Sequence, residues 1–146
     1  MVNYKKGDLF KAPEDILAHG VNCMGAFGSG VAAGMAHNHR KARDQYFDKH
    51  NRSGGWELGD VQFVRSGNKW IANCATQKDF LPRGICHADY PAIKKTMSLV
   101  KEFAMGNKMT IAIPRIGAGL AGGDWDVIKP IIEEVFSDYD LTVYEL

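Results

Sequence analysis

Apolar positions along the chain follow two spacings, and these predict strands and helices in alternation. Apolar residues three or four positions apart predict helices after Gly30, at 42–50, after Asp89 and after Asp124. Short apolar runs bounded by glycine or polar residues predict strands at 2–7, 15–22, 61–65, 70–74, 109–113 and 141–146. This order predicts an α/β fold, with a mixed sheet and helices on both of its faces.

Capping residues and prolines refine the helix boundaries. Asp89 and Asp124 are placed as N-caps, and Pro91 falls in the first turn of the helix after Asp89. Pro130 falls inside the last helix, where it removes one backbone hydrogen bond and should bend the helix. The segment 77–88 contains a proline and a glycine, so we predict an irregular loop there.

The composition is that of one ordinary globular domain, which we expect to span residues 1–146. Hydrophobic residues make up 45% of the chain and charged residues 24%. The net charge is +1 and the two signs are interspersed, so we expect no basic face for nucleic acid. The most basic run, at 37–43, is interpreted as a solvated helix end.

Cysteine and histidine spacing predicts neither a disulfide framework nor a metal site. The cysteines, Cys23, Cys74 and Cys86, form no CxxC pair, and the five histidines add no zinc-like spacing. Neither a secretory signal nor a long apolar run occurs in the sequence. We therefore expect a cytoplasmic protein that does not associate with membranes.

Two glycine-rich loops each join a predicted strand to a predicted helix. The first lies in HGVNCMGAFGSGVAAGMA, at 19–36, and the second in RIGAGLAGGDW, at 115–125. Peptide N–H groups in such loops, together with a helix N-terminus, suit a phosphate group. Neither loop carries a Walker motif or a strict dinucleotide-binding motif, and glycines can also serve tight turns alone. Two loops in equivalent positions favour the two sides of one diphosphate-binding cleft.

Four side chains around the first loop are candidates for chemistry. His19 can transfer a proton near neutral pH, or it can be a core histidine bonded to the backbone. Asn22 can hold a ribose hydroxyl or orient a water molecule. Cys23 is a nucleophile if the helix N-terminus favours its thiolate, and otherwise a small buried side chain. Phe27 can stack on a ligand or pack the loop onto the core.

Four residues outside the first loop also have two interpretations each. Asp8 can accept a hydrogen bond from an exocyclic amine, or it can cap a turn. Asp124 can position a water molecule or only cap its helix. Lys78 can contact a phosphate or act as a covalent amine, and otherwise it is an exposed loop lysine. Trp125 can close off a ligand or pack the second loop onto the core.

Several segments together resemble the macro domain family, whose members bind ADP-ribose. They are YKKGDLF, LAHGVNCMGAFGSGVAAGMA, IPRIGAGLAGGDWDVIKPIIEEVF and the final LTVYEL. The resemblance covers nearly the whole chain and keeps the order of the motifs. It implies a three-layer α/β/α fold with a central mixed sheet and a function that needs no cofactor.

Two branches of that family are similar to this sequence. The segment HGVNCMGAFGSGVA and the GGxW ending of the second loop resemble small ADP-ribose 1″-phosphate phosphatases. YKKGDLF and PRIGAGL resemble terminal ADP-ribose protein glycohydrolases, which use a lysine after the central strand and an acidic residue directly after GxGL. Ala121 occupies the acidic position, and Gln77 or Lys78 falls at the lysine position. The alanine favours the phosphatase branch.

The resemblance also implies a role for individual positions. Asp8 would bind the adenine amine with the Leu9 backbone nearby, and Asn22 would hold the distal ribose. Cys23 and Phe27 would lie beside the ligand. Backbone amides would bind the two phosphates, and they belong to Gly28, Ser29, Gly30 and Val31 in the first loop and to Ile116, Gly117, Ala118, Gly119 and Leu120 in the second.

These expectations combine into one hypothesis with two alternatives. A monomer is expected to hydrolyse ADP-ribose 1″-phosphate to ADP-ribose and phosphate, with His19 transferring a proton and Asn22 orienting ribose or water. Asp124 is a further catalytic candidate. One alternative is the release of ADP-ribose from a modified protein or nucleic acid, a reaction in which Lys78 would act. The other is ADP-ribose binding without catalysis.

Overall fold

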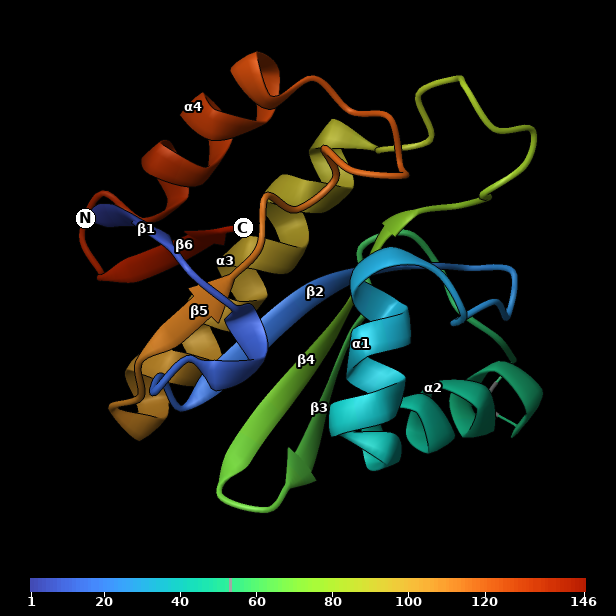
Figure 1. Ribbon diagram of the computed structural model, residues 1–146, viewed down its shortest axis with the longest axis horizontal. Coiled ribbons are helices and arrows are strands. Elements are labelled where there is room, and N and C mark those ends of the chain that lie inside the picture. The colour runs from blue at the N-terminus through green and yellow to red at the C-terminus, as the bar shows by residue number, and fades with distance from the viewer. Residues whose placement is uncertain (53) are drawn as a thin grey trace.

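The computed structural model describes residues 1–52 and 54–146, which form a six-stranded sheet in the order β1-β6-β5-β2-β4-β3 (Figure 1). Among these strands, only β3 runs antiparallel to its neighbour, so the sheet is mixed, as predicted. The strands are β1 (Val2–Lys6), β2 (Ile16–Asn22), β3 (Val61–Ser66), β4 (Lys69–Gln77), β5 (Ile111–Ile113) and β6 (Leu141–Glu145).

Helices cover both faces of this sheet, which gives the expected three-layer α/β/α arrangement (Figure 1). One face carries α1 (Gly30–Asn38) and α2 (Arg40–Arg52), and the other carries α3 (Tyr90–Asn107) and α4 (Trp125–Val135). A short 3-10 helix, η1 (Leu9–Lys11), follows β1. In the part of the chain that the structure describes, no helix is long and apolar enough to cross a membrane.

Strand β2 is buried on both faces, which explains its nearly continuous apolar sequence. Ile16 and Ala18 pack into the core cluster beneath α3 and α4. Leu17 and Val21 pack into the cluster beneath α1 and α2. Because side chains alternate along a strand, His19 falls on the same face as Leu17 and Val21.

The carboxyl ends of the parallel strands meet at one edge of the sheet. The glycine-rich loops leave β2 and β5 at this edge, and the C-terminal residue leaves β6 there. The pairing of β2 with β4 also shifts register between Val21 and Asn22, directly before the first loop. In open α/β sheets this edge is where ligands bind, so the topology brings the two candidate loops together.

The predicted helix caps are confirmed. Asp89 Oδ1 accepts a hydrogen bond from the Ala92 amide at 2.8 Å, at the start of α3. Asp124 Oδ1 accepts one from the Asp126 amide at 2.9 Å, at the start of α4. Pro130 lies inside α4, as the sequence predicts.

Candidate functional site

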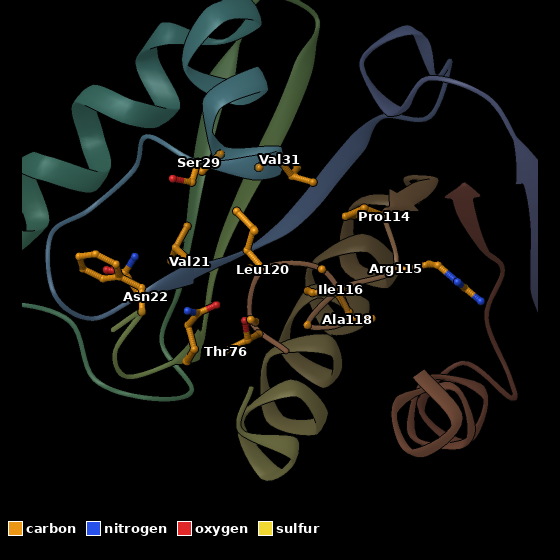
Figure 2. A pocket seen from close by; sticks show the side chains of 18 of the residues that line it. Val21, Asn22, Ser29, Val31, Thr76, Pro114, Arg115, Ile116, Ala118 and Leu120 are labelled. Atoms are coloured by element: carbon orange, nitrogen blue, oxygen red, sulfur yellow. The ribbon is translucent and has the colours of Figure 1, made fainter. Parts of the chain in front are cut away.

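A cleft of about 690 Å³ opens at the carboxyl edge of the sheet, between the two glycine-rich loops (Figure 2). This volume falls within the range of small-molecule sites, roughly 300–1,000 Å³. The nine loop residues whose amides the family resemblance assigns to phosphate binding all line the cleft. They are Gly28, Ser29, Gly30, Val31, Ile116, Gly117, Ala118, Gly119 and Leu120.

The side chain of Asn22 folds the first loop back on itself. Its Oδ1 accepts hydrogen bonds from the amides of Met24 at 3.0 Å and Ala26 at 3.3 Å. Its Nδ2 donates to the Ala26 carbonyl at 2.9 Å. Asn22 lines the cleft, so one residue both shapes the loop and faces the ligand space. Side-chain bonds of this kind replace a regular turn.

Tyr46 of α2 holds the same loop from below. Its hydroxyl donates to the Asn22 carbonyl at 2.7 Å and accepts from the Gly25 amide at 3.1 Å. Trp56 Nε1 in turn donates to the Tyr46 carbonyl at 3.1 Å. Burial raises the pKa of Tyr46 to about 12, so its hydroxyl keeps its proton at physiological pH. Sequence analysis missed this residue, because no local pattern links position 46 to the loop.

Phe27 packs the first loop onto the core and does not face a ligand. Its buried ring lies 5.0 Å from the Tyr46 ring and 5.5 Å from the His19 ring, between ring centroids. It does not line the cleft. Of the two interpretations of Phe27, core packing is therefore the one that the structure shows.

His19 does not line the cleft, so its position gives no support to the expected proton-transfer role. It is fully buried beneath α1 and α2, where its Nε2 donates to Asn73 Oδ1 at 2.6 Å. Nδ1 is buried with no hydrogen-bond partner among the described residues. Burial lowers the pKa of His19 to about 4, since a second ring proton would have no acceptor. The imidazole is therefore neutral at pH 7.

The N-terminus of α1 completes the first loop. Ser29 takes extended backbone angles ahead of Gly30, and in the described helix its side chain makes no capping hydrogen bond. The Ser29 hydroxyl and the first α1 amides therefore remain available to a ligand in the cleft.

The second loop is held by its own backbone. The amide of Ala118 donates to the Arg115 carbonyl at 3.1 Å, and that of Gly123 donates to the Gly117 carbonyl at 2.8 Å. Gly117 has a φ of +78°, which favours glycine. A Cβ on Gly123 would lie 2.4 Å from the Gly117 carbonyl oxygen, so only glycine fits there.

The two loops nearly touch across the cleft. Leu120 is 61% exposed and extends from the second loop toward the segment that carries Ser29 and Val31 (Figure 2). A Cβ placed on Gly30 would lie 3.4 Å from Leu120 Cδ1. The cleft is thus bridged by an apolar side chain over its middle.

Residues that sequence reasoning missed line the two ends of the cleft. Thr76, Phe80 and Arg83 come from β4 and the loop after it, and residues 144–146 come from β6 and the C-terminus. The parallel direction of β6 could have indicated its carboxyl end, but the loop after β4 carries no periodic signal. Gln77, rather than Lys78, is the residue of that pair that lines the cleft.

Besides His19, Phe27 and Cys23, four expected site residues lie outside the cleft lining. Lys78 is exposed, and Asp124 is an exposed helix cap. Asp8 caps η1, because its Oδ1 accepts from the Phe10 amide at 2.9 Å, and Leu9 is buried. Asp8 nevertheless lies close to one end of the cleft, since the preceding Gly7 amide donates to the Glu145 carbonyl.

Cys23 does not have the surroundings of a nucleophile. It is half-buried, packs against the core beneath α1 and α2, and does not line the cleft. Burial raises the pKa of its thiol, and the nearby Asp60 carboxylate adds to that shift. Both effects disfavour the thiolate, so the structure shows the buried-filler interpretation. Among the described residues, no three His, Cys, Asp or Glu side chains gather as a metal site.

Curated proteins similar to this chain match it along almost its full length. An uncharacterised 17.5 kDa protein of Enterobacteria phage T4 is 31% identical, over 99% of this chain and 96% of that protein. The ADP-ribose glycohydrolase OARD1 of Homo sapiens is 29% identical, over 99% and 91%. The ADP-ribose 1″-phosphate phosphatase of Candida albicans is 29% identical, over 99% of each. No family model matches the chain.

Solved structures give the same fold. The macrodomain of Mycobacterium tuberculosis DarG has a TM-score of 0.87 at 24% identity, covering 100% of this chain and 98% of that one. A macrodomain protein from Streptomyces coelicolor has a TM-score of 0.82 at 27% identity, covering 100% and 99%.

Proposed function

Because this chain belongs to the macro domain family, we propose that it binds ADP-ribose in the cleft and hydrolyses ADP-ribose 1″-phosphate to ADP-ribose and phosphate. One observation carries the proposal. Two glycine-rich loops, each at the carboxyl end of a parallel strand, line the same cleft. That arrangement suits a diphosphate flanked by two sugars.

The strand order gives the ligand a direction along the cleft. From one end of the cleft to the other, the neighbouring strands are β6, β5, β2 and β4. Asp8 lies beside β6 through the bond between Gly7 and Glu145, so the adenine belongs at that end. The loops after β5 and β2 take the two phosphates, and Asn22 meets the distal ribose near the end of β4. This pose is part of the proposal.

Catalysis in this cleft rests on positioning and electrostatics. Water is the nucleophile: its oxygen bonds to the terminal phosphorus, the bond from phosphorus to the C1″ oxygen breaks, and that oxygen receives the proton. His19 and Cys23 stand outside the cleft and supply neither base nor nucleophile. Loop amides and the α1 N-terminus stabilise the charge, and fixed groups of this kind need little rearrangement during reaction.

Two residues support phosphate removal over glycohydrolysis. Ala121 stands where glycohydrolases of the family are expected to carry an acid, and Gln77, one of the two residues at the expected lysine position, lines the cleft wall. The Gln77 side chain is also engaged, since its Nε2 donates to the Asp79 carbonyl at 2.8 Å. An amide and a methyl group cannot perform acid–base steps.

A side-by-side assay tests the proposal. The protein is incubated with ADP-ribose 1″-phosphate, with ADP-ribosylated protein and with ADP-ribosylated DNA, and released phosphate and ADP-ribose are measured. We expect phosphate release from the first substrate. Release of ADP-ribose from a macromolecule alone would reject the phosphatase assignment, and calorimetric binding without any product would indicate a binding module.

Release of ADP-ribose from a macromolecule is the second candidate, because OARD1 is named a glycohydrolase. Replacing the Lys78 side chain distinguishes the two candidate functions. Loss of de-ADP-ribosylation in Lys78→Ala, with phosphate release kept, would establish the second candidate. Since Lys78 is exposed and outside the cleft lining, we expect this variant to retain phosphate release.

A further inference from the structure

The loop between β4 and α3 places one arginine in the cleft wall. The cleft is lined by two cationic side chains, Arg83 and Arg115. Arg115 is already engaged: its Nε lies 3.2 Å from a Glu145 carboxylate oxygen, and its guanidinium lies 5.1 Å from the Trp125 ring centroid. Arg83 has no carboxylate within salt-bridge distance among the described residues. Its charge is therefore not neutralised.

The loop that carries Arg83 is braced on both sides. Before it, Asp79 Oδ1 accepts from the amides of Phe80 at 2.7 Å and Leu81 at 3.2 Å. Behind it, His87 Nε2 donates to the carbonyl of Pro82, the residue directly before Arg83, at 2.6 Å. These bonds hold the backbone on either side of Arg83 in place. Less loop entropy is therefore lost when the Arg83 side chain binds an anion.

The same loop is tied to the second glycine-rich loop. The amide of His87 donates to the Ala121 carbonyl at 2.7 Å. A Cβ on Gly122 would lie 2.6 Å from the Ile85 carbonyl oxygen, which shows how closely the two loops pack. Arg83 thus lines the cleft from the loop that leaves β4, whereas the Arg115–Glu145 pair joins the second glycine-rich loop to β6.

We infer that Arg83 binds the terminal phosphate of ADP-ribose 1″-phosphate and so makes the cleft prefer this compound to ADP-ribose. The inference rests on the proposed function, which puts the distal ribose near the end of β4. A terminal phosphate adds close to two negative charges at neutral pH. A planar guanidinium can donate two parallel hydrogen bonds to its oxygens, and such charged bonds are the strong ones.

Three variants test this assignment. Arg83→Gln removes the charge, Arg83→Lys keeps it without the two-pronged geometry, and Arg40→Gln removes the same charge from an exposed position outside the cleft. For Arg83→Gln we expect kcat/KM on ADP-ribose 1″-phosphate to fall about 10-fold to 100-fold. The affinity for ADP-ribose, measured by calorimetry, should stay within about 3-fold of wild type. ADP-ribose has no terminal phosphate, so it loses no ionic bond when Arg83 is replaced. For Arg83→Lys, kcat/KM on ADP-ribose 1″-phosphate should lie between the values of wild type and Arg83→Gln, and for Arg40→Gln it should equal that of wild type.

A second measurement separates this inference from the proposed function. Inorganic phosphate is titrated into protein saturated with ADP-ribose, and we expect binding that Arg83→Gln abolishes. If wild type releases no phosphate from the substrate but shows this Arg83-dependent binding, the function fails and the anion subsite stands. If Arg83→Gln weakens the binding of ADP-ribose and of its 1″-phosphate equally, or weakens neither, Arg83 does not bind the terminal phosphate and the inference is wrong.

Discussion

The two glycine-rich loops reach one cleft but are held in opposite ways. Side chains hold the first: Asn22 bonds its own loop, and Tyr46 reaches it from α2. Backbone bonds hold the second, with Gly117 and Gly123 packed where no side chain fits. A loop held by side chains fails when a distant partner is lost, whereas a loop held by backbone fails when a glycine gains a Cβ.

The glycines within each loop are not equivalent. A Cβ on Gly28 in the first loop would meet no atom within 4 Å, and neither would one on Gly119 in the second. A Cβ on Gly123 would lie 2.4 Å from one backbone oxygen and 2.9 Å from both Ala88 Cβ and Ile128 Cδ1. Glycine content alone therefore does not identify which positions the cleft depends on.

The largest effect should follow Gly123→Ala. The new Cβ overlaps the Gly117 carbonyl oxygen, so the second loop must move or unfold locally. We expect a loss of about 3 kcal/mol or more in the free energy of unfolding, and ADP-ribose binding too weak for calorimetry. Denaturant unfolding measures the first. Gly119 lies in the same loop but has open space around it, so the free energy of unfolding of Gly119→Ala should be within about 0.5 kcal/mol of wild type. Equal losses of stability in Gly119→Ala and Gly123→Ala would contradict the packing argument.

His19 should affect stability through pH and leave turnover unchanged. Folding lowers its pKa from 6.5 to about 4, so the folded chain binds fewer protons in that interval. The stabilisation is complete above pH 6.5 and is lost as pH falls toward 4, with a full amplitude of roughly 3 kcal/mol. Unfolding of wild type and His19→Gln between pH 7 and 4 measures it, and the variant should lose less stability on acidification.

The same variant tests whether His19 takes part in catalysis. Because the imidazole lies outside the cleft lining, phosphate release at pH 7 per folded molecule should stay near wild type in His19→Gln. A residue acting as general acid or base contributes about 10²–10⁴-fold. A loss of that size, with ADP-ribose affinity unchanged, would restore His19 to the mechanism.

Asn22→Ala should weaken the first loop more than it destabilises the fold. The substitution removes the acceptor for two amides and the donor to the Ala26 carbonyl. Since these groups lie near the surface of the cleft, water can replace part of the loss. We expect ADP-ribose affinity to fall about 10-fold to 100-fold, for roughly 1.5–3 kcal/mol. Calorimetry reports the affinity, and an unchanged dissociation constant would show that the loop holds its shape without Asn22.

Much of the fold follows from local patterns in the sequence. The caps Asp89 and Asp124 and the apolar runs set the elements, and parallel strands then force both glycine-rich loops to one edge. The position of His19 was also readable. His19 points to the same face of the strand as Leu17 and Val21, and it lies three residues before the carboxyl end of β2, so a buried strand places it beneath the helices and back from that end.

Other site residues depend on contacts that no local pattern encodes. Arg83 sits in a loop without periodicity, and its place in the cleft follows from bonds to the second loop. Thr76 lies beyond the strand predicted at 70–74, yet it belongs to β4 and lines the cleft near the end of that strand. Tyr46 lies 24 residues along the chain from Asn22, and its hydroxyl reaches the Asn22 carbonyl only through the tertiary fold.

Tyr46→Phe should have the smallest effect of these substitutions, and it tests whether a side chain of α2 holds the first loop. It keeps the ring contacts with Phe27 and Trp56 and removes only the hydroxyl, which leaves the Gly25 amide and the Asn22 carbonyl without that partner. We expect a loss of about 1 kcal/mol in unfolding free energy and a fall of about 3-fold to 10-fold in ADP-ribose affinity.

A matched control makes the Tyr46 result specific. Tyr4→Phe removes a hydroxyl that meets Glu133 at 3.3 Å on the surface, so both quantities should stay at wild-type values. Because the pKa of Tyr46 is raised to about 12, the difference between the two variants should not change from pH 6 to 9. If Tyr46→Phe destabilised the fold without weakening ADP-ribose, the first loop would keep its shape through Asn22 alone, and α2 would be only a support for the core.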